Sequence, residues 1–214
     1  MKYKTVLFDL DGTLSRSGDG VHDGIVFALN ELGAPVPDLS DYSRYIGPPL
    51  IDTFQKVAGL NEENAVKAIA LYKEYYLENG KYKNEAYTGI PELLQHLKDN
   101  GVHLAVATTK NEGFAKWVVE YIGLSEYFEA ICGVPDDYSI KEKYQVIQRA
   151  LERIEDSSVD STVMIGDSKF DTEGARLAGC DFIGVTYGYG KREQMEKEGA
   201  RLFVDSANDL YDML

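Results

Sequence analysis

Residues 5–13 have the sequence TVLFDLDGT, an apolar run that ends in two carboxylates and a glycine. The run from Thr5 to Phe8 lacks alternation between apolar and polar side chains, which is typical of a strand buried on both faces of a parallel sheet. Gly12 can turn the chain sharply away from the end of that strand. We therefore expect Asp9 and Asp11 to face one cleft at the carboxyl end of the strand.

Helix and strand patterns alternate strictly from Gly89 onward. The expected helices cover residues 90–99, 112–122, 140–153 and 171–178, with a last one near Leu210; the expected strands cover residues 103–108, 128–133, 162–165, 182–185 and 202–204. This order predicts an α/β fold with a doubly wound parallel sheet and helices on both faces. Ligands of such sheets bind outside the carboxyl ends of the strands, near a reversal of strand order.

The stretch between the first strand and this alternating part has helical periodicity and no convincing strand. We expect residues 1–14 and 88–214 to form the α/β core, and residues 15–87 to form a small α-helical domain inserted after the first strand. Asn61 is the expected cap of a helix that ends at Asn79-Gly80 and carries Val66, Ile69, Ala70 and Leu77 on one face. Seven tyrosines of this region are expected to pack in a small core: Tyr42, Tyr45, Tyr72, Tyr75, Tyr76, Tyr82 and Tyr87.

A second pair of acids lies in the sequence GDSKFD at residues 166–171, directly after an apolar strand. Magnesium favours a few carboxylates together with water and substrate phosphate. Asp9, Asp167, Asp171 and the backbone carbonyl of Asp11 are therefore the expected ligands, and manganese would fit the same oxygens. Two other interpretations are a helix cap for Asp171 and a calcium loop for residues 9–13, although the loop lacks the required spacing of acids.

Paired carboxylates suit phosphoryl transfer, because one can attack phosphorus while the other protonates the leaving oxygen and later activates water. Donors must also hold the negative equatorial oxygens of the phosphoryl group. Thr108, at the end of a predicted strand, and a lysine would meet that need. Lys143 is the first choice because it opens an amphipathic helix, and Lys141 is the alternative.

The chain of 214 residues carries a formal net charge of -14, which disfavours nucleic acid as a partner. No apolar run is long enough to span a membrane, so we expect no membrane association, a cytoplasmic location and, by default, a monomer. Cys132 and Cys180 lie far apart in apolar stretches, which predicts buried free thiols.

The sequences DLDGT at 9–13, VATTK at 106–110 and GDSKFD at 166–171, with a lysine near 143, together resemble the haloacid dehalogenase superfamily. The resemblance covers nearly the whole chain. It is greatest to the phosphoglycolate-phosphatase-like branch, and includes YIGPPL at 45–50 and GVTYGYG at 184–190.

This resemblance implies a nucleophile at Asp9 and a general acid and base at Asp11. It implies phosphate binding by Thr108, Thr109 and Lys143, and a magnesium site made by Asp9 and Asp11 with Asp167 and Asp171. Residues 15–87 would be a helical cap that closes over the cleft, with Arg44, Gly47 and Pro48 as candidate specificity residues.

The function that we expect is magnesium-dependent hydrolysis of a small-molecule phosphate monoester through an aspartyl phosphate. Phosphoglycolate, nucleoside monophosphates and sugar phosphates are all candidate substrates. A sugar phosphomutase would use the same core and cap. A phosphoaspartate signalling module is a further alternative, but it would need neither a large lid nor an acid two residues beyond the phosphorylated aspartate.

Overall fold

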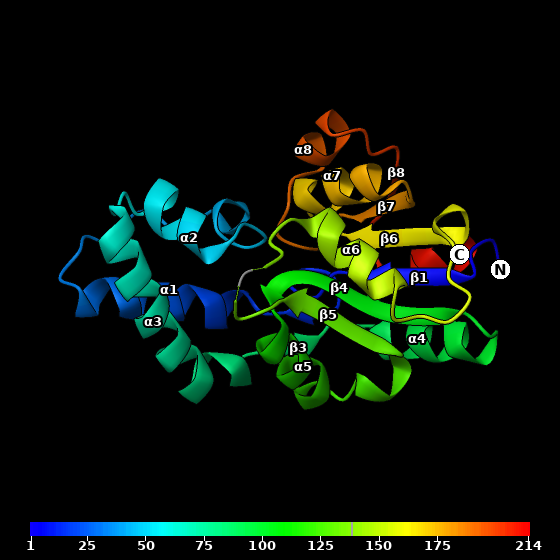
Figure 1. Cartoon of the computed structure of the whole chain (residues 1–214), viewed down its shortest axis with the longest axis horizontal. Helices are drawn as coiled ribbons and strands as arrows, with labels where there is room; N and C mark the ends of the chain where they lie inside the picture. The colour runs from blue at the N-terminus through cyan, green and yellow to red at the C-terminus, as the bar shows by residue number, and fades with distance from the viewer. Residues whose placement is uncertain (138) are drawn as a thin grey trace.

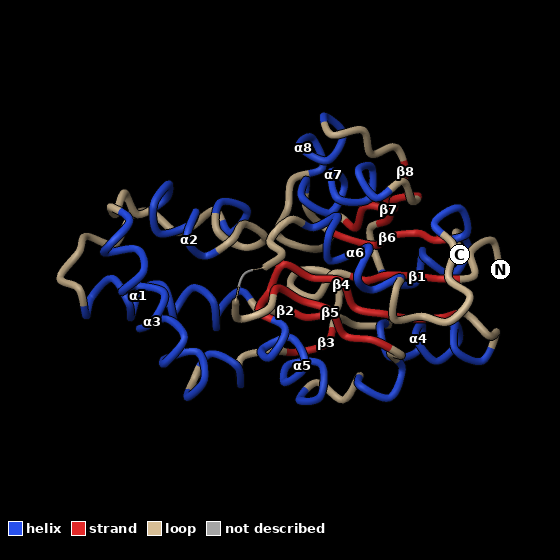
Figure 2. Tube along the Cα trace, viewed as in Figure 1, coloured by secondary structure: helices blue, strands red, loops and turns tan. Residues whose placement is uncertain are grey.

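A computed structural model describes residues 1–137 and 139–214. A six-stranded parallel sheet, in the order β5-β4-β1-β6-β7-β8, forms its centre (Figures 1 and 2). The strands are β1 (Thr5–Phe8), β4 (His103–Asn111), β5 (Ala130–Val134), β6 (Thr162–Gly166), β7 (Asp181–Val185) and β8 (Leu202–Val204). The predicted doubly wound α/β fold is confirmed.

Strand β1 is central and pairs with β4 on one side and β6 on the other, so that Val6 lies opposite both Leu104 and Val163. The chain adds strands outward from β4 to β5, then returns past β1 to begin β6. The order of strands therefore reverses beside β1. The carboxyl end of β1 is consequently where a sheet of this kind binds its ligands.

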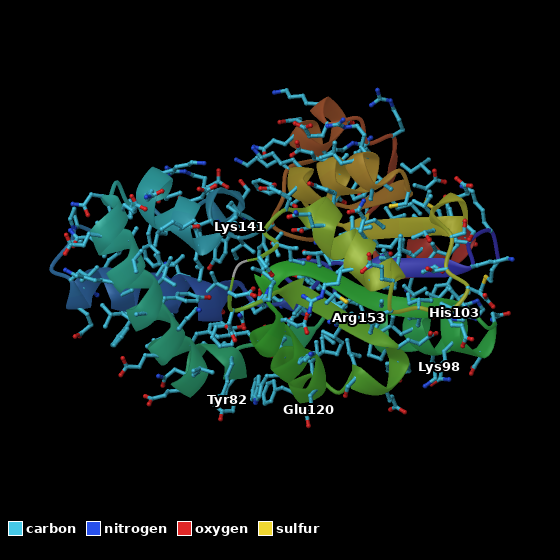
Figure 3. The ribbon with its side chains drawn as sticks, in the orientation of Figure 1. Tyr82, Lys98, His103, Glu120, Lys141 and Arg153 are labelled. Atoms are coloured by element: carbon cyan, nitrogen blue, oxygen red, sulfur yellow. The ribbon has the colours of Figure 1, made fainter. Side chains whose placement is uncertain are left out.

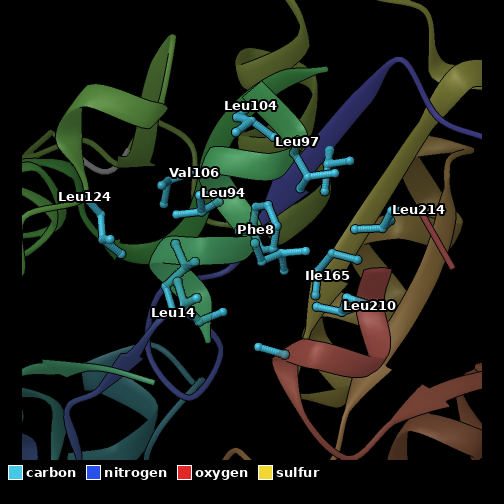
Figure 4. Packing of buried hydrophobic residues seen from close by; sticks show 14 of the residues in the cluster. Phe8, Leu14, Leu94, Leu97, Leu104, Val106, Leu124, Ile165, Leu210 and Leu214 are labelled. Carbon is cyan, nitrogen blue, oxygen red and sulfur yellow. The ribbon is translucent and has the colours of Figure 1, made fainter. Parts of the chain in front are cut away.

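Helices cover both faces of the sheet. Val6 and Phe8 face an apolar cluster with α4 (Ile90–Asp99) and α5 (Glu112–Tyr121), part of which is drawn in Figure 4. Leu7 faces the opposite cluster, with α6 (Lys143–Leu151) and α7 (Lys169–Ala178). Burial on both sides explains why β1 shows no polar alternation. A short helix, α8 (Arg192–Lys197), and a 3-10 turn at Ala207–Asp212 complete this part.

Some predicted boundaries are wrong by a few residues. Helix α6 begins at Lys143 instead of residue 140, because Glu142 caps it and exchanges hydrogen bonds with Gln145 in a capping box. Helix α7 begins at Lys169, before the predicted residue 171, and β4 extends past residue 108 to Asn111.

Residues between β1 and α4 form a helical lobe, at the left of Figure 1, with an apolar cluster of its own. Its helices are α1 (Gly18–Glu31), the short α2 (Leu50–Asp52), which continues as a π-helical turn (Thr53–Val57), and α3 (Glu62–Glu78). Short 3-10 turns lie at Tyr42–Arg44 and Gly80–Tyr82. Tyr45, Tyr72 and Tyr76 are buried in the cluster, as their expected packing role requires.

The expectation that residues 15–87 contain no strand is wrong. β2 (Ser15–Arg16) and β3 (Glu85–Ala86) pair antiparallel where the chain enters and leaves the lobe. Each strand has two residues, too few to give a recognisable pattern. The Ser15 hydroxyl also donates a hydrogen bond of 2.9 Å to the Asn84 side-chain oxygen. The two segments that enter and leave the lobe are therefore linked both by strand pairing and by a side-chain hydrogen bond.

The face on which α3 packs differs in part from the prediction, because only Ile69, of the four predicted residues, packs against the lobe's apolar cluster. The residues that α3 buries are Ala65, Ala68, Tyr72 and Tyr76, whereas Val66 and Leu77 are 57% and 47% exposed. Alanines allow close approach to α1, and Gly24 of α1 leaves room for the Tyr72 ring. The predicted ends of α3 are confirmed, since the Asn61 side chain accepts from Asn64 N at 2.9 Å and the helix ends at Glu78.

Across residues 1–137 and 139–214, none of the helices is both long and apolar enough to cross a membrane. Cys132 is buried and Cys180 half-buried, and both are free thiols.

Leu94 tests the contribution of the sheet's apolar cluster. Its side chain is fully buried, and Leu94→Ala should lower the free energy of unfolding by about 2–5 kcal/mol because the substitution leaves a cavity. Urea denaturation followed by circular dichroism measures the change. Leu177→Ala, the same substitution at an exposed site on α7, should change stability by less than about 0.5 kcal/mol. Equal effects of the two substitutions would contradict the described packing.

Candidate active site

The carboxyl ends of three adjacent strands bring together residues from distant parts of the chain. Asp9 follows β1, Thr108 lies in the last part of β4, and Asp167 follows β6; all three side chains are buried. Parallel pairing of β1 with both neighbours aligns these ends at one edge of the sheet. The predicted convergence of strand-end residues therefore exists.

Asp9, Asp167 and Asp171 form a compact cluster. One carboxylate oxygen of each lies within 4.8 Å of the other two. The Lys143 ammonium is 2.6 Å from Asp9 Oδ1 and 2.6 Å from Asp171 Oδ1. With all three carboxyls ionised, the cluster and Lys143 together would carry two negative charges, which is the charge that a divalent cation neutralises. The donors are all oxygens, so they fit Mg²⁺ or Mn²⁺ better than a thiolate-seeking metal.

Asp171 is held by the start of α7. Ser168 is the N-cap residue, and its backbone N–H and hydroxyl donate to Asp171 Oδ2 at 3.0 and 2.6 Å. Asp171 is thus the N3 residue of a capping box, whereas the alternative interpretation made it the N-cap residue. Its other oxygen contacts Lys143. Capping and a place in the acid cluster therefore coexist in one side chain.

Asp167 is held by the loop at residues 188–190. The backbone N–H groups of Tyr189 and Gly190 donate to Asp167 Oδ2 at 2.6 and 3.1 Å. A Cβ on Gly190 would lie 1.9 Å from the Asp167 carbonyl oxygen, and one on Gly188 would lie 2.4 Å from Asp167 Cβ. Only glycine permits this approach. The GVTYGYG segment forms part of the family resemblance, but its role in supporting Asp167 was not predicted from the sequence.

Burial raises the pKa of the Asp9 carboxyl to about 6; the nearby charge of Asp171 adds to the rise, and Lys143 opposes it. Burial, followed by the charges of Asp171 and Asp9, raises the pKa of Asp167 well above its usual range. Ionisation of these neighbouring carboxyls is therefore opposed by burial and by repulsion between their charges in the folded protein. A bound cation would relieve that repulsion.

Asp11 pairs with a different cation, Lys110, which was not predicted from the sequence. The Lys110 ammonium lies 3.1 and 2.9 Å from the two Asp11 carboxylate oxygens, and 4.7 Å from the centre of the Tyr76 ring on α3. Burial opposes the charge of Lys110, but Asp11 and the neighbouring tyrosines raise its pKa well above the usual range. One sequence feature could have identified Lys110 as a site residue: it ends VATTK, directly after two threonines at a strand end.

The predicted phosphate-binding residues occupy different positions. Thr108 is buried, and its hydroxyl oxygen accepts from Lys110 N at 3.2 Å. Thr109 instead donates to the Gly47 carbonyl of the helical lobe at 3.0 Å. Lys143 is buried against Asp9, whereas Lys141 is exposed at the junction of lobe and sheet (Figure 3). Of the two lysines, Lys143 therefore has the position suited to a group at Asp9.

A cavity of about 540 Å³ opens above the carboxylates, between the sheet and the helical lobe. Asp9, Asp11, Thr108, Thr109 and Lys110 contribute to its sheet side. Of the three lobe candidates, Gly47 and Pro48 line the cavity. Arg44 is exposed, donates to the Asp38 carbonyl at 3.3 Å, and is absent from the described lining.

Comparisons with known proteins agree with this geometry. A family model of haloacid dehalogenase-like hydrolases matches residues 6–185. A 5'-nucleotidase of Pseudomonas aeruginosa is 36% identical over 91% of this chain and 88% of its own. The tyrosine-protein kinase PtkA of Mycobacterium tuberculosis is 36% identical over 94% of this chain and 68% of its own. The crystal structure of a predicted phosphatase from Clostridium acetobutylicum is 39% identical, with a TM-score of 0.93 over 100% of this chain and 98% of that one.

Binding of Mg²⁺ should raise the midpoint of thermal unfolding at pH 7.5. A ligand at 100 times its dissociation constant stabilises the folded state by about 2.7 kcal/mol. The pKa of Asp9 is raised on folding, so its ionisation destabilises the folded state increasingly as pH rises through about 6. Below that pH protons compete with the cation, and the thermal shift should be smaller at pH 5. Scanning calorimetry with Mg²⁺ and with chelator measures both shifts.

Asp167→Asn should greatly reduce the Mg²⁺-dependent shift, because it removes one anionic ligand of the cluster. Asp160→Asn, at an exposed carboxylate, is the matched control and should keep the full shift. A shift of equal size in both variants would exclude Asp167 from the cation site.

Proposed function

Because the chain belongs to the haloacid dehalogenase-like hydrolase family and is a phosphatase of that family, we propose that it hydrolyses a small-molecule phosphate monoester, using Mg²⁺ and a covalent phosphoenzyme. Phosphoglycolate, nucleoside monophosphates and sugar phosphates are the candidate classes. The observation that carries the proposal is that Asp9 and Asp11 line the same cavity, and the contact of buried Asp9 with Lys143 at 2.6 Å supports it.

In the first step, a carboxylate oxygen of Asp9 attacks phosphorus and the ester P–O bond breaks, which leaves an aspartyl phosphate. Asp11, in its protonated form, gives a proton to the departing alkoxide, so a neutral alcohol leaves. Lys143 contacts Asp9, and Thr108 lines the same cavity as Asp9, so both are suited to hold the equatorial oxygens of the phosphoryl group. A neutral alcohol and a phosphoenzyme result.

In the second step, water attacks the phosphorus of the aspartyl phosphate. Asp11, now ionised, accepts a proton from that water, the acyl P–O bond breaks, and Asp9 regains its carboxylate as inorganic phosphate leaves. Asp11 therefore serves as acid and then as base, with its proton restored. Transfer to a sugar hydroxyl instead of water would give the phosphomutase reaction, so release of free phosphate distinguishes the two.

Asp9, Asp167, Asp171 and the backbone carbonyl of Asp11 are the proposed Mg²⁺ ligands. The bound cation would neutralise charge on the carboxylates and on the phosphoryl oxygens, so that two anions can approach. The Lys143 contact to both Asp9 and Asp171 keeps the nucleophile oriented.

We also propose that residues 15–87 act as a cap on the core at residues 1–14 and 88–214. Four contacts across the boundary support a closed arrangement. Tyr189 accepts from Gly18 N at 2.6 Å and stacks on Tyr42 at 5.5 Å between ring centres. Thr109 donates to Gly47, and Lys191 pairs with Asp41. Such a cap excludes water from the reacting groups. A cytoplasmic monomer remains a prediction from the sequence.

Asp9→Asn should abolish turnover while the protein stays folded, because an amide cannot form the acyl phosphate. Phosphate release from p-nitrophenyl phosphate with Mg²⁺ measures the loss, expected to exceed about 1000-fold. Calorimetry checks folding, and Asp160→Asn serves as the active control. Turnover of Asp9→Asn at the wild-type rate would exclude the covalent mechanism.

Lys110→Met should slow turnover most for esters with poor leaving groups, because Asp11 then loses the cation that fixes its carboxylate. Loss of general-acid action costs about 100-fold or more for such esters, and less for p-nitrophenyl phosphate, whose phenolate leaving group needs little protonation. Lys110→Arg retains the charge and should restore part of the rate. The measurement is kcat for aryl phosphates of graded leaving-group pKa. A uniform loss across the series would show that Lys110 does not act through Asp11.

A further inference from the structure

The cavity above Asp9 has two chemically different sides. Its sheet side is polar around the reacting groups. On the helical lobe the lining is largely apolar: Val21, Ile46, Pro48, Leu50, Ile51, Val66, Ile69 and Ala70. Among the described residues that line the cavity, Glu62 and Lys73 are the charged ones from the lobe. A wall of this composition favours a ligand that brings apolar surface with it.

Helix α3 provides a second observation. Val66 and Ala70 lie on an exposed face of α3 that is not the one that buries Ala65, Ala68, Tyr72 and Tyr76 in the lobe. Ile69 lies at the edge between the two faces, half-buried and packed against the lobe's apolar cluster. Val66 is 57% exposed although it is β-branched and apolar. An apolar stripe that is exposed within a cavity marks a binding surface more than a packing surface.

Size and charge separate the three candidate substrate classes. At about 540 Å³ the cavity falls within the ordinary range for organic ligands, and phosphoglycolate would fill a small part of it. The carboxylate of phosphoglycolate would also lie close to Asp9 and Asp11, where the nearby Lys110 is already paired with both oxygens of Asp11. A hexose would turn several hydroxyls toward a wall with few polar partners, whereas a nucleoside can place its planar base against that wall and its sugar nearer the polar sheet side.

We infer that the leaving group is an uncharged, ring-containing alcohol of about nucleoside size, so that nucleoside monophosphates are preferred over phosphoglycolate and hexose phosphates. The ring lies against Val66 and Ile69 of α3, while the phosphoryl group lies at Asp9. Phe114 of α5 lines the same cavity and adds an aromatic face to it. This inference rests on the proposed function, since it takes Asp9 as the site of phosphoryl transfer.

The experiment measures kcat/KM with Mg²⁺ for thymidine 5′-monophosphate, 1-naphthyl phosphate, 2-phosphoglycolate, glucose 6-phosphate and acetyl phosphate. Acetyl phosphate is small and activated, so it reports the chemistry with little contribution from the apolar wall. We expect the two ring-bearing esters to exceed phosphoglycolate and glucose 6-phosphate by at least about tenfold.

Val66→Asn and Ile69→Asn make the wall polar without adding charge. Each should lower the ratio of kcat/KM for 1-naphthyl phosphate to that for acetyl phosphate by about tenfold, mainly through KM. Leu77→Asn is the matched control: it lies on the same helix, is 47% exposed and does not line the cavity, so the ratio should not change. Val66 is exposed enough that its substitution should leave folding intact, which calorimetry checks.

The outcomes are distinguishable. A preference for phosphoglycolate or glucose 6-phosphate, or ratios unchanged in both wall variants, would overturn the substrate class while Mg²⁺-dependent hydrolysis of acetyl phosphate still supported the phosphatase. Absence of Mg²⁺-dependent release from every compound, acetyl phosphate included, would overturn the proposed function itself.

Discussion

The Lys143 ammonium, placed between Asp9 and Asp171, is the interaction on which the site depends. It joins the end of β1, the start of α6 and the first turn of α7 within 2.6 Å contacts. Without it, the three carboxylates of the cluster would repel one another in a buried setting. Helix α7 accommodates the lysine through Gly174, where a Cβ would lie 2.6 Å from Lys143 Cγ. The packing of α6 on α7 and the electrostatics of the site therefore both depend on the position of Lys143.

The sheet and its acids could be predicted from the sequence because the signals are local. A four-residue apolar strand followed by Asp9, Asp11 and Gly12 indicates both a buried strand and the point where it ends. The preference for Lys143 over Lys141 follows similar logic, since it rests on which lysine opens the amphipathic helix. The cap at Glu142 fixes that start, and a shift of two residues would remove the ammonium from Asp9.

The rest could not be predicted because it depends on contacts between distant segments. Lys110 resembles a surface lysine until the Tyr76 ring of the lobe covers it and Asp11 pairs with it. The support of Asp167 by Tyr189 N–H comes from backbone groups, which no side-chain pattern reveals. On α3, hydrophobicity alone favoured the Val66 face for packing, whereas close approach to α1 required the alanine face.

The short pairing of β2 with β3 has a consequence for how the chain folds. Strand β1 must find β4 across the whole helical lobe, and closing a long loop before any contact forms slows folding. Once Ser15 lies against Ala86, the lobe is closed off at its base, and the path along the chain from β1 to β4 becomes short. The length of the lobe then adds little to the entropy of forming the central sheet. Segments of other lengths could occupy the same position, and the order of the sheet strands would stay the same.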